Sequence, residues 1–288
     1  MGEGLEVALR AGALLGEGPT WDEQSARLLW VDILAAEIHS FDPATGQDPV
    51  LRTQQHVGAA KPRAGGGLVA NLRDGVGLYD SDGDFHWLAD LAVEGCRGND
   101  AAVDAAGYLW AGTMRYDETA GGGRLYRVAP AGEVVTVLDG VAVSNGIGWS
   151  PDGRRMYYVD SPTRRVDLFD VDPGAGLVAS RRTFLELAEV PGFPDGLAVD
   201  ADGCIWVAFW DGGVVQRFTP TGQLDRRVEV PAARTTACAF GGPGLRDLYI
   251  TTATAGLDAG QLASQPLAGS LFVLADAGQG LASPSFAG

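Results

Sequence analysis

Four residues that carry side-chain oxygens occupy the same local setting at distant places in the chain. Each comes directly before a short apolar segment typical of a buried β-strand, as in GEGPTW and FPDGLAVD; they are Glu17, Asn99, Asn145 and Asp195. Two carboxylates and two amides are hard oxygen ligands, which suit Ca²⁺, Mg²⁺ or Mn²⁺ and also hold Zn²⁺ or Fe²⁺. If the fold brings them together, they form a cation site that leaves positions for water and substrate.

Each of these residues, taken alone, has a simpler interpretation as part of a turn. Pro, Asp, Asn and Gly favour turns, and Asp195 lies between Pro194 and Gly196. Recurrence at four equivalent places favours a shared site over four unrelated turns. Without a cation, the carboxylates of Glu17 and Asp195 would repel each other and one would take up a proton.

A repeat explains how residues so far apart can meet. Similar segments begin at intervals of 40 to 50 residues, at Glu17, Val57, Asn99, Asn145, Asp195 and Thr236. Each copy has an apolar strand, a turn such as SPDG or DADG, an aromatic and β-branched strand, and two further strands separated by a Gly turn. The second strands are expected at Leu28–Asp32, Tyr108–Gly112, Met156–Asp160 and Ile205–Phe209. The sequence therefore predicts an all-β fold, a six-bladed β-propeller with four antiparallel strands per blade.

The ends of the chain and the first strands complete this prediction. GLEVALRAG, before the first copy, supplies a strand that closes the last blade, so that residues 1–288 form one propeller domain. The first strand of each propeller blade lies nearest the central channel, which would gather the four oxygen-bearing side chains at one mouth. Val57 and Thr236 break the pattern, so two blades are expected to contribute no ligand.

Composition excludes several classes of function. The net charge of −16 opposes binding to nucleic acid or anionic membranes. No apolar run reaches the roughly 20 residues of a membrane span, and the N-terminus makes a poor signal peptide, so a cytoplasmic protein is expected. Three widely spaced cysteines favour buried thiols over disulfides or a thiolate zinc site. The sequence gives no indication of the oligomeric state.

Several long motifs, in order and over essentially the whole chain, resemble the senescence-marker-protein/gluconolactonase family of regucalcin-like sugar lactonases. They include LLGEGPTWD, RGNDAAVDAAGYLWAGTM, VSNGIGWSPDG, FPDGLAVDADGCIWVA and TTACAFGG. The resemblance implies one divalent metal ion (Ca²⁺, Zn²⁺, Mn²⁺ or Fe²⁺) at the channel mouth and hydrolysis of a small-molecule sugar lactone to an aldonic acid.

Roles for individual residues follow from the same resemblance. The metal ligands would be Glu17, Asn145 and Asp195, and Asp195 would also serve as the catalytic acid and base. Arg97 and Asn99, from RGND, would bind the substrate. A further substrate-binding acid is expected after AGTM, where either Glu118 or Asp117 fills the role because the segment is one residue longer here.

Two other functions are compatible with these residues. One is a metal-dependent hydrolase of other esters, lactones or organophosphates, which a wider and more apolar channel rim would favour. The other is a calcium-binding propeller without turnover, since propellers also serve as binding platforms. Asp195 together with Arg97 argues against the second, because a plain calcium site needs no cation beside it.

Overall fold

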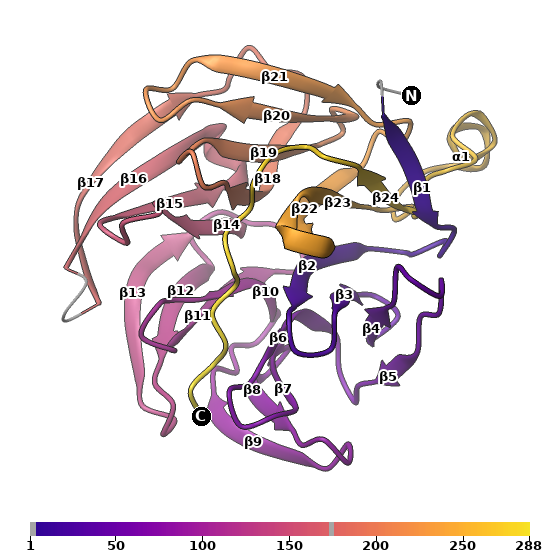
Figure 1. Cartoon of the computed structure of the whole chain (residues 1–288). Helices are drawn as coiled ribbons and strands as arrows, with labels where there is room; N and C mark the ends of the chain where they lie inside the picture. Colours follow the sequence, from indigo (N-terminus) through magenta and orange to yellow (C-terminus); the bar gives the residue numbers. More distant parts are fainter. Residues whose placement is uncertain (1–3, 173–175) are drawn as a thin grey trace.

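Six four-stranded antiparallel sheets make up the computed structural model, and they surround a common axis as the blades of a β-propeller (Figure 1). The structure describes residues 4–172 and 176–288. The predicted fold class is confirmed, as are the second strands expected from the repeat.

Three blades come from the first half of the chain, each built outward from the axis in sequence order. The first contains β2 (Gly16–Asp22), β3 (Arg27–Asp32), β4 (Glu37–Phe41) and β5 (Val50–Arg52). The second contains β6 (Val57–Pro62), β7 (Leu68–Leu72), β8 (Gly75–Tyr79) and β9 (Phe85–Asp90). The third contains β10 (Cys96–Val103), β11 (Leu109–Arg115), β12 (Gly123–Val128) and β13 (Val134–Val141).

The second half of the chain forms the other three blades. The fourth contains β14 (Ser144–Trp149), β15 (Arg155–Asp160), β16 (Arg165–Asp172) and β17 (Leu177–Glu186). The fifth contains β18 (Phe193–Val199), β19 (Ile205–Trp210), β20 (Val214–Phe218) and β21 (Leu224–Glu229). The sixth contains β22 (Thr235–Gly241), β23 (Asp247–Thr252), β24 (Leu271–Leu274) and β1 (Leu5–Leu9). The pairing of β1 with β24 confirms that the N-terminal segment closes the ring.

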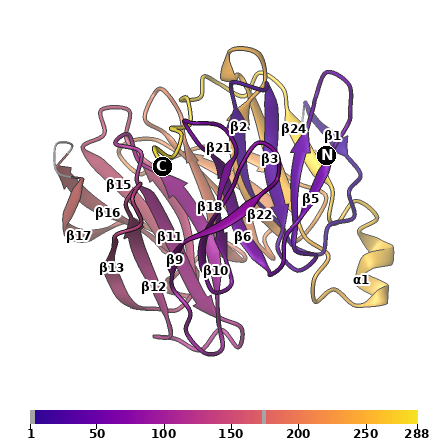
Figure 2. The same cartoon turned by 90° about the horizontal axis from the view of Figure 1, so that it is seen from below.

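Helical structure is confined to three short pieces within the described residues. Two are single 3₁₀ turns, Ser161–Thr163 and Pro243–Leu245. The third is α1 (Ala259–Ser264), which Asp258 begins with a capping box to Gln261. In Figure 2, α1 and the C-terminal tail lie toward opposite faces of the propeller.

All six inner strands are irregular at the same place. The register against the second strand shifts at Glu17/Thr20, Val57/Ala59, Gly98/Ala101, Ser144/Ile147, Pro194/Leu197 and Thr235/Ala237. Such a bulge frees one or two residues from the ladder and re-aims their side chains. Asn99, Asn145 and Asp195 lie inside these bulges and Glu17 lies at the edge of one. The bulges therefore turn these four side chains away from ordinary positions on the sheet.

Glycines let neighbouring inner strands approach closely beside these bulges. A Cβ atom on Gly146 would lie 2.7 Å from the Asp195 carbonyl oxygen, and one on Gly196 would lie 2.3 Å from the Ala237 Cβ. A Cβ on Gly58 would lie 2.2 Å from the Asn99 carbonyl oxygen. These glycines are required because no side chain fits between the strands.

Aromatic and charged side chains join strands within the blades. Asp200 accepts hydrogen bonds from Trp206 Nε1 (3.0 Å) and Arg217 Nε (2.8 Å) beneath the strand turn, and Asp104, Trp110 and Arg127 repeat the arrangement. The tryptophans of both groups are buried, as expected for residues that pack the blades, and all three cysteines are buried free thiols.

No helix among the described residues is long and apolar enough to cross a membrane. The cytoplasmic location stays a prediction from the sequence.

The close contact at Gly146 gives a test of how the ring is packed. Gly146→Ala is expected to lower the free energy of unfolding by about 1–3 kcal/mol, because the added methyl group overlaps the Asp195 backbone. Gly65→Ala is the matched control, since nothing lies within 4 Å of that site. Urea denaturation of both variants measures the difference, and equal stabilities would contradict the packing argument.

Candidate functional site

The inner strands of four blades carry the predicted site residues to one end of the channel. Glu17 lies on β2, Arg97 and Asn99 on β10, Asn145 on β14, and Asp195 on β18, and all five side chains are buried. Each stands near the beginning of its strand. The strands start at the same end of the channel, so residues from four distant parts of the sequence meet there.

A chain of hydrogen bonds links three of these side chains to one another and to Ser161. Arg97 Nη1 donates to Asn99 Oδ1 (2.6 Å), and Asn99 Nδ2 donates to Asn145 Oδ1 (2.7 Å). Asn145 Nδ2 in turn donates to Ser161 Oγ (2.7 Å). The last bond holds the Asn145 amide with its carbonyl oxygen directed toward the other site residues, where it has a second lone pair for a ligand.

The carboxyl groups of Glu17 and Asp195 are both buried at this end of the channel, and the charge of Glu17 acts on Asp195. Burial, followed by the charge of Asp100, raises the pKa of Glu17 to about 8, although the Gly18 N–H group donates to it at 2.9 Å. Burial also raises the pKa of Asp195 well above its usual value, and the charge of Glu17 raises it further. The pocket therefore resists holding two negative charges, as expected from the sequence for a site without a cation.

The residues fit a divalent cation. The Oδ1 atom of Asp195 is buried and has no hydrogen-bond partner, although buried carboxylate oxygens are normally satisfied. A cation beside Asp195, Glu17 and the Asn145 carbonyl oxygen would satisfy it and offset the repulsion between the carboxylates. Within residues 4–172 and 176–288 no cluster of three or more His, Cys, Asp or Glu side chains is placed to hold a metal ion. The candidate set of ligands is two carboxylates and one amide.

Arg97 is held rigidly beside the carboxylates. Its Nη1 atom donates to the Gly98 carbonyl oxygen (2.9 Å) as well as to Asn99, which leaves the Nε and Nη2 donors for a ligand. Burial lowers the pKa of Arg97, while the charges of Tyr116, Glu17, Glu118 and Asp195 act in the opposite direction. The guanidinium group remains charged, as arginine does in proteins.

Asp117 and Glu118, the two acids that the sequence left as alternatives, have different surroundings in the structure. Asp117 accepts two hydrogen bonds from Arg115, at 2.8 and 2.9 Å, and this pairing lowers its pKa. Glu118 has a left-handed backbone conformation with φ of 56°, and its charge acts on Arg97. The Asp117 carboxylate is thus occupied by Arg115, whereas Glu118 is exposed near the site.

Sequence reasoning missed several neighbours of the site. His56 Nδ1 lies 2.8 Å from the Tyr116 hydroxyl, and burial together with the charge of Arg97 lowers the pKa of His56. Lys61 and Asp100 lie deeper in the channel and act on the charge of Glu17. The sequence could have indicated Asp100, because it directly follows Asn99 in RGND. It gave no indication of Lys61 or His56, because their blade has Val57, without a side-chain oxygen, at the repeat position.

Comparison with known proteins agrees with the predicted resemblance. A family model described as the SMP-30/gluconolactonase/LRE-like region matches residues 15–254. A pentonolactonase of Haloferax volcanii is 40% identical over 240 residues, which are 83% of this chain and 81% of the relative. A 6-deoxy-6-sulfogluconolactonase of Pseudomonas putida is 37% identical over 292 residues, with 100% of both chains covered.

A solved structure is similar over nearly the whole chain. The structure of a calcium-binding protein, regucalcin, from Agrobacterium tumefaciens matches with a TM-score of 0.94 and 32% sequence identity, over 97% of this chain and 96% of that one. Fold, motifs and sequence identity therefore lead to one assignment: the chain belongs to the SMP-30/gluconolactonase/LRE-like family.

Proposed function

We propose that this protein hydrolyses sugar lactones to aldonic acids with the help of one divalent metal ion held by Glu17, Asn145 and Asp195. The observation that carries the proposal is the buried, unpartnered Asp195 Oδ1 atom, beside a second carboxyl group and a fixed guanidinium. The names of the relatives support it, since they include a pentonolactonase and a sulfogluconolactonase. Asp195 and Arg97 together offer a base and a cation to one small polar substrate.

The metal would be Ca²⁺, Zn²⁺, Mn²⁺ or Fe²⁺, because three oxygen ligands accept each of these ions. A similar structure is that of a calcium-binding protein, which supports Ca²⁺ as the first ion to try. When bound, such an ion supplies positive charge that polarises a carbonyl group and lowers the pKa of water.

Asp195 would move the proton in this reaction. Its carboxylate accepts a proton as a water oxygen bonds to the lactone carbonyl carbon, and it returns that proton to the ring oxygen as the ring C–O bond breaks. The atoms balance, since one water adds across one ester bond to give a carboxylic acid and a hydroxyl group. General acid–base catalysis of this kind contributes about 10²–10⁴-fold.

Arg97, Asn99 and Glu118 would orient the substrate. The free Nε and Nη2 donors of Arg97 match the ring and hydroxyl oxygens of a polyol. Glu118 is an exposed acceptor at the rim, where a sugar hydroxyl can donate to it. Positioning of this kind keeps the lactone carbonyl beside Asp195.

The first experiment is proton release from glucono-, galactono-, xylono- and arabinono-lactones with chelator-stripped protein reconstituted with each of the four ions. Metal-dependent release above spontaneous hydrolysis is expected. If none of the four is hydrolysed, the same assay is run with aryl esters, acyl lactones and organophosphates, and release from these would instead show a different ester hydrolase. Metal binding without turnover of any of these would show a calcium-binding propeller.

Removal of the proposed acid–base group should abolish most turnover. Asp195→Asn keeps the side-chain shape and is expected to lower kcat by about 10²–10⁴-fold and to weaken metal binding. Asp202→Asn is the control, because that carboxylate is exposed on the same blade, where it pairs with Arg217. Lactonase assays and metal titration measure both effects. Near wild-type activity of Asp195→Asn would refute its assignment.

The rim acids can be told apart by a pair of variants. Glu118→Gln is expected to lower kcat/KM by about tenfold, a loss that corresponds to about 1.4 kcal/mol. Asp117→Asn should change kcat/KM much less, because its carboxylate is already bound by Arg115. If Asp117→Asn has the larger effect on kcat/KM, the two roles are reversed.

The raised pKa of Glu17 predicts how stability depends on pH. A carboxyl group with a pKa of about 8 in the folded protein, against 4.5 ordinarily, holds more protons in the folded state between these values. The free energy of unfolding of the metal-free protein therefore falls as the pH rises from 4.5 to 8.

Denaturation of metal-free protein at several pH values measures this slope. Glu17→Gln should flatten it by up to about 1.4 kcal/mol per pH unit, whereas Glu23→Gln, at an exposed turn, should leave it unchanged. Identical slopes in the wild type and Glu17→Gln would mean that Glu17 does not carry the extra proton.

A further inference from the structure

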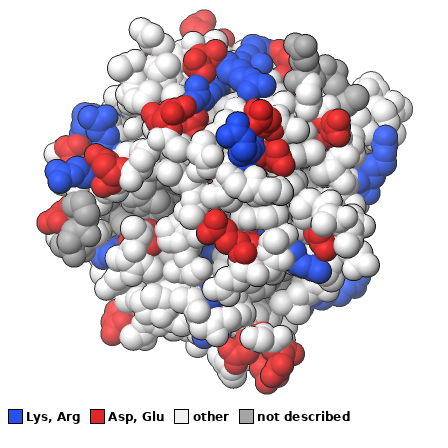
Figure 3. Space-filling model, in the orientation of Figure 1, with Lys and Arg blue, Asp and Glu red and all other residues white. Residues whose placement is uncertain are grey.

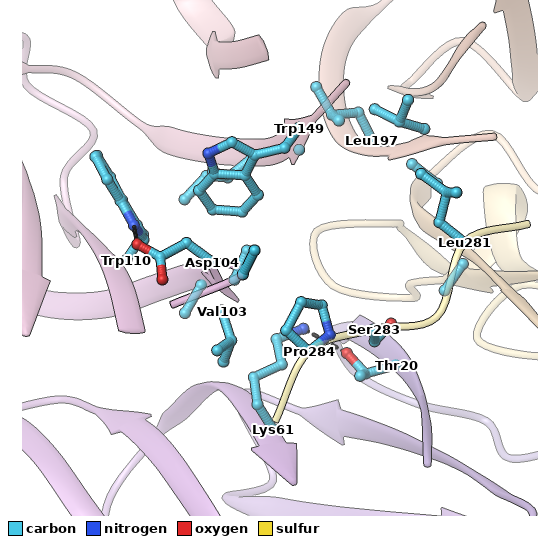
Figure 4. Close-up of a pocket in the computed structure, with 18 of the residues that line it drawn as sticks. Thr20, Lys61, Val103, Asp104, Trp110, Trp149, Leu197, Leu281, Ser283 and Pro284 are labelled. Carbon is cyan, nitrogen blue, oxygen red and sulfur yellow. Dashed lines mark hydrogen bonds between the residues drawn. The ribbon is translucent and has the colours of Figure 1, made fainter. Parts of the chain in front are cut away.

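A cavity of about 500 Å³ lies at the other end of the channel from the candidate metal site (Figure 4). It is lined by the later parts of the inner strands, including Val103, Trp149 and Leu197. None of the five predicted site residues on the inner strands lines it. Residues that directly follow three of them do, namely Gly18, Asp100 and Gly196. The cavity is therefore a second space, which begins behind the candidate site.

The polar end of the cavity contains one buried cation and one carboxylate. Lys61 Nζ donates to Thr20 Oγ1 (2.5 Å) and to the Gly18 carbonyl oxygen (3.3 Å), and only 8% of the Lys61 residue is exposed. An ammonium group has three donors, so one is left after these two bonds. Asp100 accepts from its neighbour's N–H group through Oδ1 at 2.7 Å, which leaves Oδ2 as an acceptor. The polar end thus offers one donor and one acceptor to a ligand.

The walls of the cavity are mostly apolar. Figure 4 shows Trp149, Val103, Leu197 and Leu281 around the same open space, with Lys61 and Thr20 at one end of it. Trp149 is half-buried: its ring packs edge-on against that of Trp110, with centroids 5.8 Å apart, and it also lines the cavity. An indole that faces an open cavity is available for contact with a ligand.

The C-terminal tail crosses this face of the propeller and roofs the cavity (Figure 1). It is tied down on both sides, by a hydrogen bond from Gly280 N to the Leu245 carbonyl oxygen (2.8 Å) and by one from Phe286 N to the Pro62 carbonyl oxygen (2.9 Å). Phe286 is fully buried. Between these two points, Leu281 to Pro284 line the cavity. Acidic and basic side chains are interspersed on this face of the propeller, without a large patch of one charge (Figure 3).

We propose that this cavity binds an uncharged amphipathic small molecule, with a hydroxyl head between Lys61 and Asp100 and an apolar body against Val103, Trp149 and Leu197. This site is distinct from the proposed lactonase site and does not depend on it.

The pairing of groups at the polar end determines the class of ligand. A hydroxyl group accepts from Lys61 and donates to Asp100 at the same time. A carboxylate head would pair with Lys61 but also face the Asp100 carboxylate, and an ammonium head would pair with Asp100 but also face Lys61. A hydroxyl group satisfies both partners without placing like charges together in a poorly solvated space. The volume lies within the range of about 300–1,000 Å³ that is typical of small-molecule pockets, and the apolar walls match an aromatic or alicyclic body.

Binding of three neutral alcohols tests the proposal: 3-phenylpropan-1-ol, 1-hexanol and cyclohexylmethanol. Calorimetry and quenching of tryptophan fluorescence are expected to show saturable binding of at least one. Its matched carboxylate (3-phenylpropanoate, hexanoate or cyclohexanecarboxylate) should bind at least about tenfold more weakly. Absence of saturable binding of all three alcohols up to their solubility limit, or equal affinity for the matched carboxylate, would overturn the proposal.

Variants locate the bound alcohol. Ala239→Phe should abolish binding by filling the cavity, because Ala239 lines it and strand alternation points its side chain away from that of Phe240, which lies in the core. Lys61→Met should weaken binding about tenfold or more by removing the donor. If Lys61→Met fails to fold, Ala239→Phe alone shows whether the alcohol binds in the cavity. Glu118→Gln, at the opposite mouth, should leave the affinity unchanged; loss of binding in Glu118→Gln but not in Ala239→Phe would place the alcohol at that mouth and refute the proposal.

Discussion

The close approach of six inner strands around one axis is the constraint on which the rest of the structure depends. The strands come so near that Gly58, Gly146 and Gly196 cannot be exchanged for larger residues without overlap of backbone atoms. Each inner strand also has a bulge at the equivalent position along the channel. The bulges remove short segments from the ladder, and these segments carry the polar side chains that meet at the axis.

Crowding of this kind also sets the electrostatics of the channel. Burial raises the pKa of both Glu17 and Asp195. The charge of Asp100 raises the pKa of Glu17 further, and the charge of Glu17 raises that of Asp195, so desolvation and repulsion act in the same direction on both carboxyl groups. Their protonation or a bound cation is the physical means of lowering that cost. Lys61 and Asp100 lie farther along the channel under the same desolvation, and burial lowers the pKa of the first and raises that of the second.

The two ends of the channel differ because each inner strand presents different residues at its beginning and at its end. The beginnings carry oxygen-bearing and cationic side chains, as with Asn99 on β10 and Asn145 on β14. The later parts carry apolar residues such as Val103 and Trp149, and the C-terminal tail covers them. One end therefore suits a polar ligand that needs charge, and the other suits an amphipathic one.

The sequence by itself determined the propeller, the number of blades, the closure by the N-terminal strand and the four oxygen-bearing positions. It did so because strand alternation and turn residues are local signals, and a sixfold repeat makes each of them visible several times. Only the tertiary structure showed that Asp117 is paired with Arg115, that Asp195 keeps an unpartnered oxygen, and that Lys61 and Asp100 form the polar end of a cavity. The first feature depends on how one loop of the third blade folds. The other two depend on distances between residues on different blades and on how much water the packing excludes. The order of residues in the sequence gives none of these.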